Sequence, residues 1–169
     1  WRDAGVRMKG ATGSFRPIDD KPAFTVSFDE FVPGQRFHGL SKVHLNNSVE
    51  DASCLHEKLG GELFRAAGVP APRVGHAEVE LNRRRLGLYV LKEGFAAEFL
   101  GLHFARAGGN LYDAGTGSEI TEPLKRSSGS GPADGSDLGR LADAAQEPDA
   151  ARRWQRLGGV LDVERFVSF

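Results

Sequence analysis

The stretch Leu45–Pro72 reads LNNSVEDASCLHEKLGGELFRAAGVPAP and decides the fold expected for the whole chain. It predicts the end of a strand, then a capped amphipathic helix, then an abrupt stop. Asp51 or Ser53 can accept hydrogen bonds from the unpaired amides of the first helical turn. Gly68 stands where a left-handed residue ends a helix, and two prolines follow it. The apolar residues of the helix fall on one stripe, which we expect to lie on a sheet: Leu55, Leu59, Leu63 and Ala66.

The segments on both sides of this helix have the alternating apolar and polar residues of β-strands. Three strands are expected before the helix, at residues 5–10, 22–31 and 39–47. A hairpin is expected after it, with strands 74–81 and 86–92 joined by a turn at 82–85. The three arginines of that turn would form either a basic patch or, as we expect, an ordinary solvated turn. An antiparallel sheet with one helix packed on a face gives an α+β fold.

Composition limits the classes of function open to the chain. Its 169 residues, 40% of them apolar, can bury one core and at most a second, smaller unit. The formal net charge of −1 gives no attraction toward nucleic acid, so we expect no nucleic-acid partner. No apolar run approaches the length of a membrane span, and the five histidines lack paired metal-ligand spacing. The single cysteine, Cys54, is expected to be a small buried apolar group.

The rest of the chain divides into a connection and a helical region. Residues 95–107 predict a short helix, and GNLYDAG predicts a turn with a brief strand. Residues 116–136 are rich in Gly, Ser, Pro and Asp and predict a flexible connection without secondary structure. Helices are expected at 138–145 and 150–157, and Asp162 can cap a last one. The expected organisation is a small lobe at 1–94, a hinge and connecting segment at 95–113, a linker at 114–137 and the start of a helical lobe at 138–169.

The order of strand, loop, two strands, helix and hairpin is that of the small lobe of a protein kinase. In that lobe a glycine-containing loop covers the phosphates of ATP, and a lysine of the third strand pairs with a glutamate of the helix. The candidate phosphate loop consists of Lys9, Gly10, Ala11, Thr12 and Gly13. It has only two glycines and matches neither common nucleotide-binding pattern, so an ordinary hairpin loop would explain it equally well.

Further candidates for the nucleotide site lie on the third strand, on the helix and on the last strand. Lys42 is the partner expected for Glu57, although spacing alone also allows Glu57 to face water. Three polar residues gather where the helix begins, and capping would also explain them: Asn46, Asn47 and Asp51. The hinge, at 89–93, would bind adenine through backbone groups, among them those of Val90, Lys92 and Glu93.

The combination of LNN, a following Asp, the helix motif HEKLGGELF and GVPAPR resembles the CotH kinase family, the spore coat protein H group. The resemblance runs continuously over residues 5–113 and resumes near 157. It implies an atypical protein kinase fold that binds ATP with magnesium, in a secreted, spore-coat or cell-surface protein. Similar proteins phosphorylate coat proteins in spores, and related fungal proteins act as invasins. The positions that correspond to family features are Gly10 to Gly13 for the phosphate loop, Asn46, Asn47 and Asp51 for the signature before the helix, and Glu57 for its acidic position.

The chain also departs from the family pattern. His56 stands where similar sequences carry Arg, and Gly60–Gly61 stands where they carry Ala and an aromatic residue. Similar sequences often place a basic residue at Ser27. Either Lys42 contacts phosphate, or that position supplies the phosphate-contacting lysine in active relatives and this chain lacks it. The family's catalytic Asp and metal-binding Asn are expected beyond Phe169, so we expect no catalytic residue and no metal ligand within this sequence. The expected function is the ATP-binding lobe of a kinase for coat or surface proteins; the alternative is a non-catalytic coat-assembly or surface-adhesion module.

Overall fold

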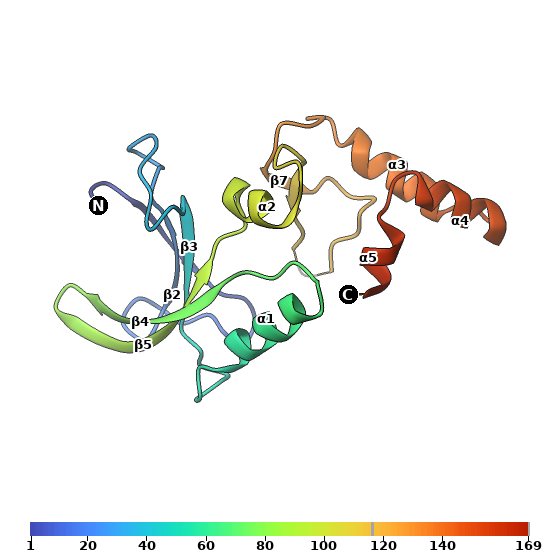
Figure 1. The fold of residues 1–169 in the computed structure, drawn as a ribbon. Coiled ribbons are helices and arrows are strands. Elements are labelled where there is room, and N and C mark those ends of the chain that lie inside the picture. The colour runs from blue at the N-terminus through green and yellow to red at the C-terminus, as the bar shows by residue number, and fades with distance from the viewer. Residues whose placement is uncertain (116, 169) are drawn as a thin grey trace. The chain divides into compact units, whose positions relative to one another are not determined.

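The computed structural model describes residues 1–115 and 117–168. The chain forms two compact units, Trp1–His103 and Phe104–Phe169. Figure 1 shows β2 to β5 with α1 in the first unit, and β7 with α3 to α5 in the second. The candidate site lies in the first unit.

The first unit is built on a five-stranded sheet in the order β1-β2-β3-β5-β4, with all neighbours antiparallel. The strands are β1 (Gly5–Lys9), β2 (Ala23–Ser27), β3 (Lys42–Asn46), β4 (Val74–Leu81) and β5 (Arg84–Glu93). β5 lies between two strands and supplies the centre of the core, because Tyr89 and Val90 are almost completely buried. The Tyr89 hydroxyl donates to the carbonyl of Pro22 at 2.8 Å. The expected α+β fold with an antiparallel sheet is confirmed.

The helix that follows β3, α1 (His56–Ala66), begins and ends at the signals that the sequence carries. The carboxylate of Asp51 accepts a hydrogen bond of 2.9 Å from the first amide of the helix. The Ser53 hydroxyl accepts one of 3.2 Å from the amide just before it. Gly68 has a φ of 79°, the left-handed conformation that ends the helix. The prediction of both helix ends is therefore confirmed.

The apolar stripe of α1 does not lie on the sheet, and this part of the prediction is wrong. Leu59 and Leu63 are 59% and 71% exposed, and Leu55 at the start of the stripe is 44% exposed. None of the helix residues is buried. Periodicity identified which side of the helix is apolar, but it could not identify which side meets the sheet.

The side of α1 that meets the sheet is polar. Glu57 points toward the strands, while Arg65 donates to the carbonyl of Pro72 at 2.6 Å. Between them lies Gly61, where an added Cβ would stand 3.3 Å from the same Pro72 oxygen. A glycine here therefore allows the helix to approach the chain that leads into β4.

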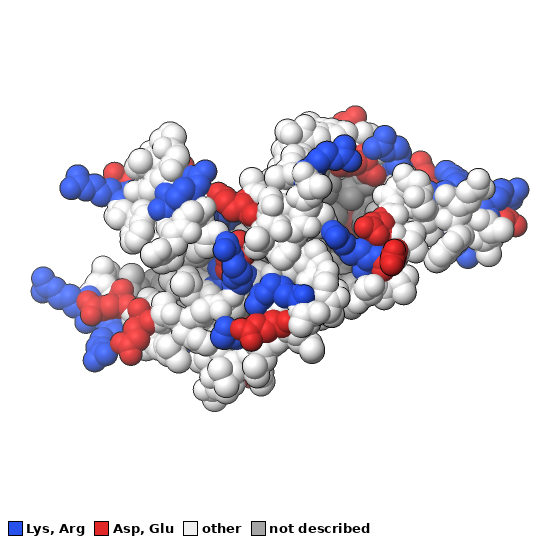
Figure 2. All heavy atoms as spheres, in the orientation of Figure 1, with Lys and Arg blue, Asp and Glu red and all other residues white. Residues whose placement is uncertain are grey.

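The hairpin of β4 and β5 has charges of both signs near its tip. Arg85 forms an ion pair with Glu78 at 3.0 Å, and Arg84 donates to the backbone carbonyls of Ile18 and Asp19. Figure 2 shows basic and acidic side chains interspersed over this hairpin rather than a field of one sign. The turn arginines thus fit a solvated turn better than a basic patch.

The chain leaves the sheet through α2 (Ala97–His103), whose Phe99 and Leu100 are buried. The second unit contains β6 (Leu111–Asp113), β7 (Lys125–Ser128), α3 (Ser136–Ala145), α4 (Ala150–Gly158) and α5 (Val163–Ser168). Asp162 accepts from the amide of Arg165 at 3.1 Å and so caps α5 as expected.

The stretch expected to lack secondary structure contains β7, which pairs with β6. A hydrogen bond of 2.6 Å from the Tyr112 hydroxyl to Asp137 fixes the start of α3 beside this hairpin. Gly, Ser and Pro content signals turns, but it does not reveal a pairing with a distant segment.

Candidate functional site

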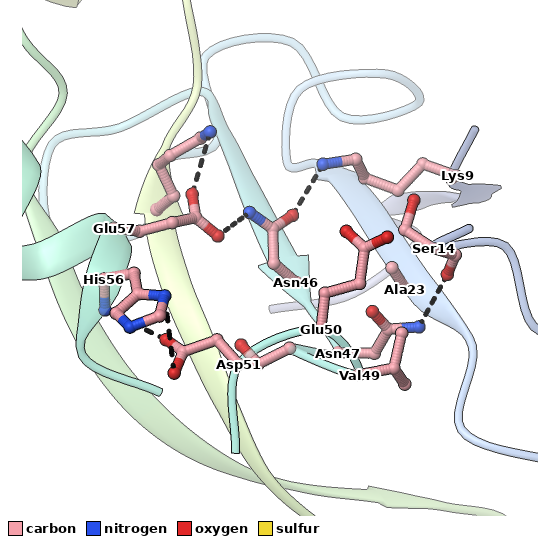
Figure 3. Close-up of a pocket in the computed structure, with 13 residues that line it drawn as sticks. Lys9, Ser14, Ala23, Asn46, Asn47, Val49, Glu50, Asp51, His56 and Glu57 are labelled. Atoms are coloured by element: carbon pink, nitrogen blue, oxygen red, sulfur yellow. Dashed lines mark hydrogen bonds and ion pairs between the residues drawn. The ribbon is translucent and has the colours of Figure 1, made fainter. Parts of the chain in front are cut away.

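A pocket of about 420 Å³ opens in the first unit where β1 and β3 end and α1 begins. Figure 3 shows the residues that line it. Seven residues named from the sequence are among them: Lys9, Gly10, Asn46, Asn47, Asp51, Glu57 and Lys92. The remaining named residues do not line the pocket: Ala11, Thr12, Gly13, Lys42, Val90 and Glu93.

Four polar side chains from three strands and the helix form a continuous chain along the pocket (Figure 3). Lys9 Nζ donates to Asn46 Oδ1 at 2.6 Å. Asn46 Nδ2 donates to Glu57 Oε1 at 2.5 Å. Lys92 Nζ forms an ion pair with Glu57 Oε2 at 3.0 Å. Asn46 therefore orients Glu57, and Glu57 in turn holds the ammonium group of Lys92 at the pocket.

Two lysines line this pocket, and Glu57 is the carboxylate that compensates the positive charge of both. The pKa values of these groups show that the compensation is incomplete. Burial and then repulsion by Lys92 lower the pKa of Lys9, while Glu57 opposes the effect. Burial alone would raise the pKa of Glu57, but hydrogen bonds from Asn46 and Lys92 outweigh it and hold the pKa below its usual value. A cation whose charged form is disfavoured gains from an incoming anion, so this part of the pocket suits an anionic ligand.

The loop after β1 needs both of its glycines. Gly10 and Gly13 have φ values of 135° and 94°, which other residues rarely adopt. An added Cβ would lie 2.7 Å from the Cα of Phe15 at Gly10, and 2.5 Å from Oε1 of Glu50 at Gly13. Gly10 lines the pocket, whereas Ala11 to Gly13 form the turn beside it.

The polar residues at the start of the helix have structural partners as well as pocket positions. Asn47 is buried, and its Nδ2 donates to the carbonyls of Ser14 at 3.0 Å and Lys21 at 2.8 Å. It therefore ties the loop after β1 to β3. Asp51 caps α1, which agrees with the alternative interpretation that this residue serves helix capping. Figure 3 shows both side chains on the floor of the pocket formed by the segment before α1.

The expected ion pair between Lys42 and Glu57 is not formed, because Lys92 takes that position. Lys42 stands at the opposite end of β3 from Asn46. Its side chain packs against Gly94, where an added Cβ would lie 2.7 Å from Cγ of Lys42. The strand pattern alone predicted Lys42 as the partner of Glu57. The partner depends instead on which end of the strand lies beside the helix, and Lys42 is at the other end.

The expected adenine-binding hinge at 89–93 stays a prediction, and the backbone of residues 90–93 is engaged in the sheet. Val90 pairs with β3 on one side and β4 on the other, and so does Lys92. The amide of Glu93 donates to the carbonyl of Arg73 at 3.0 Å. The Glu93 side chain is also occupied, with Arg73 at 2.9 and 3.0 Å. Chain that is free of the sheet begins only after Gly94.

Several residues line the pocket that sequence reasoning did not name as site residues. They are Ser14, Ala23, Ser48, Val49, Glu50 and His56. Glu50 and His56 lie in or next to the segment that joins β3 to α1, and His56 Nδ1 is 3.6 Å from Asp51 Oδ1. Their position beside the Asn and Asp signature was the available signal. Nothing in their residue types separated them from ordinary surface polar residues.

The sheet, the helix across its end and the pocket with two lysines define an α+β unit with a candidate anion site. Residues 6–169 match the sequence model of a family described as CotH kinase protein. The chain therefore belongs to the CotH kinase family. A search of the curated proteins found no match. Within the residues that the structure describes, no helix is long and apolar enough to cross a membrane, and no group of three or more acidic, His or Cys residues could hold a metal ion.

Proposed function

We propose that the pocket binds the phosphate groups of ATP, entering with magnesium, as the nucleotide-binding part of a CotH-type protein kinase. The chain of Lys9, Asn46, Glu57 and Lys92 is the observation that carries this proposal. It joins a lysine of the sheet to a glutamate of the helix, the ion pair on which protein kinases depend to position ATP.

The chemistry of the pocket residues supports a phosphate ligand. Ammonium groups of Lys9 and Lys92 act as point charges toward phosphate oxygens, and both are partly withdrawn from water. Gly10 lets the backbone of the loop come close to a ligand. Magnesium, when bound with the nucleotide, would neutralise the charge on its phosphates. The unit as a whole would then correspond to the small lobe of a kinase.

We extend the proposal to the reaction on the basis of family membership. Phosphoryl transfer needs positioning and charge stabilisation more than covalent chemistry from the protein. The residues of this unit would hold and orient the nucleotide. The acceptor would be a hydroxyl side chain of another protein, and coat or surface proteins are the class that the family implies.

A titration of the purified chain with ATP, ADP and adenosine tests the proposal. Because the lysines contact phosphate, affinity should fall in that order. Lys92→Met should weaken ATP binding about tenfold or more, the effect of losing one charged hydrogen bond. Lys42→Met is the matched control, since Lys42 lies on the same face of the sheet as Lys92 but outside the pocket. This variant should bind ATP like the parent.

Two results would contradict the proposal. One is adenosine binding as tightly as ATP, and the other is an equal loss of affinity in the Lys92 and Lys42 variants. Thermal unfolding of each variant without ligand checks that the fold is retained.

A second candidate, a non-catalytic module that binds other proteins, is favoured by a separate observation. Leu59 and Leu63 on α1 are 59% and 71% exposed. Exposed apolar stripes of this kind often mark protein interaction surfaces. This candidate becomes the better account if the titration finds no affinity for ATP or ADP.

A further inference from the structure

The pocket has three carboxylates, and only one of them is unpaired. Glu57 binds Asn46 and Lys92. Asp51 accepts hydrogen bonds from Ser53 and from the first amide of α1. Glu50 has no hydrogen bond or ion pair with any residue that the structure describes.

Glu50 is exposed, and it is one of the residues that line the pocket. It lies so close to the loop after β1 that a Cβ added at Gly13 would stand 2.5 Å from its Oε1. Figure 3 shows it turned into the pocket, with no dashed line to a neighbour. The Glu50 carboxylate thus lies between the pocket and the turn of the loop after β1 that contains Gly13.

This arrangement presents an electrostatic problem for a phosphate ligand. Three carboxylates and two lysines line the pocket, so a triphosphate would meet a net excess of negative charge among them. A free carboxylate beside phosphate oxygens is repulsive unless a cation lies between them. Mg²⁺ is commonly bound through one or two carboxylates together with substrate phosphates and water. One glutamate carboxylate is within the number of protein ligands that such a cation takes.

We propose that Glu50 is a protein ligand of the divalent cation that enters with the nucleotide, with the cation bridging its carboxylate and the phosphate oxygens. The inference rests on the proposed function, because the cation arrives with ATP. It assigns a metal contact to the segment between β3 and α1, where the sequence had suggested none. Asp51 is excluded from this role because its oxygens cap the helix.

The test is the ATP affinity of the full chain and of Glu50→Gln, each measured in Mg²⁺ and in EDTA. In EDTA, Glu50→Gln should bind ATP more tightly than the parent, because a repulsive charge is gone. In Mg²⁺ the order should reverse, because a ligand of the cation is gone. The factor by which Mg²⁺ strengthens ATP binding should fall about tenfold. Mn²⁺ in place of Mg²⁺ gives a second readout, since the relaxation of water protons reports its binding directly.

Glu80→Gln is the matched control. Glu80 is an exposed glutamate of β4 outside the pocket, and its variant should show the Mg²⁺ dependence of the parent. If Glu50→Gln strengthens ATP binding equally in Mg²⁺ and EDTA, Glu50 only repels phosphate and the inference is overturned. An unchanged affinity in both conditions overturns it too, while the proposed function stands. Failure of the parent to bind ATP in either condition would overturn the proposed function and this inference with it.

Discussion

At the scale of single residues, positive charge gathers on one face of the sheet and is only partly balanced. Lys9, Lys42 and Lys92 come from three strands, and all three disfavour a proton on His44. Burial, the largest cause, acts with these cations to lower the pKa of His44 to about 4. Its Nδ1 lies 3.0 Å from the hydroxyl of Thr25. A neutral ring separates the lysines without adding another charge, so the face keeps its capacity for an anion.

His44 should make the stability of the fold depend on pH. Its pKa falls from 6.5 to about 4 on folding, so the unfolded chain binds the extra proton between these values. Stability is then lost as the pH falls through this window and is constant above it. We expect a contribution of about 2 kcal/mol between pH 7 and 4, reduced from the full shift because the ring is partly exposed.

Denaturant unfolding at several pH values measures this contribution. His44→Gln can still bond Thr25 but cannot titrate, so it should lose that part of the pH dependence. If the free energy of unfolding has the same slope against pH in both proteins between pH 6.5 and 4, His44 is not the source of the pH dependence.

At the scale of elements, α1 shows what local sequence can and cannot predict. Its ends were predictable because Asp51 and Gly68 act on neighbouring backbone groups. Its orientation was not, because the side that meets the sheet carries Glu57, Gly61 and Arg65 rather than leucines. A polar interface of this kind follows from the partners that the folded sheet supplies. Hydrophobic periodicity contains no information about those partners.

The two adjacent glycines of α1 should respond differently to alanine. At Gly60 no atom lies within 4 Å of an added Cβ, so Gly60→Ala should raise the free energy of unfolding by about 1 kcal/mol. At Gly61 the added Cβ would meet the carbonyl of Pro72 at 3.3 Å, and Arg65 already holds that carbonyl. Gly61→Ala should therefore be less stable than Gly60→Ala and fall below the parent. Urea unfolding of the parent and the two variants measures these differences in stability. Equal stabilisation by both substitutions would contradict the orientation of α1.

At the scale of the whole molecule, the fold was more predictable than the site. Alternating residues predicted the strands and their positions along the chain, since each strand carries its own period. The partner of Glu57 could not be predicted, because it depends on the register of β5 against β3, which places Lys92 opposite His44. The pairing of β7 with β6 was missed for the same reason. For a contact between distant segments, the residue types limit which pairs can form. The register of the strands determines which pair does form.

Hydrogen exchange of the full chain with and without ATP and Mg²⁺ tests the central claim most directly, because it locates the ligand without a mutation. A ligand in the pocket should slow exchange in residues 10–15 and 48–58, which hold the loop after β1 and the start of α1. The hairpin turn at 82–85 serves as an internal control, since it lies outside the pocket and should not change. Protection confined to residues 104–168, or none at all with ATP in excess, would contradict the assignment of the pocket as the ATP site.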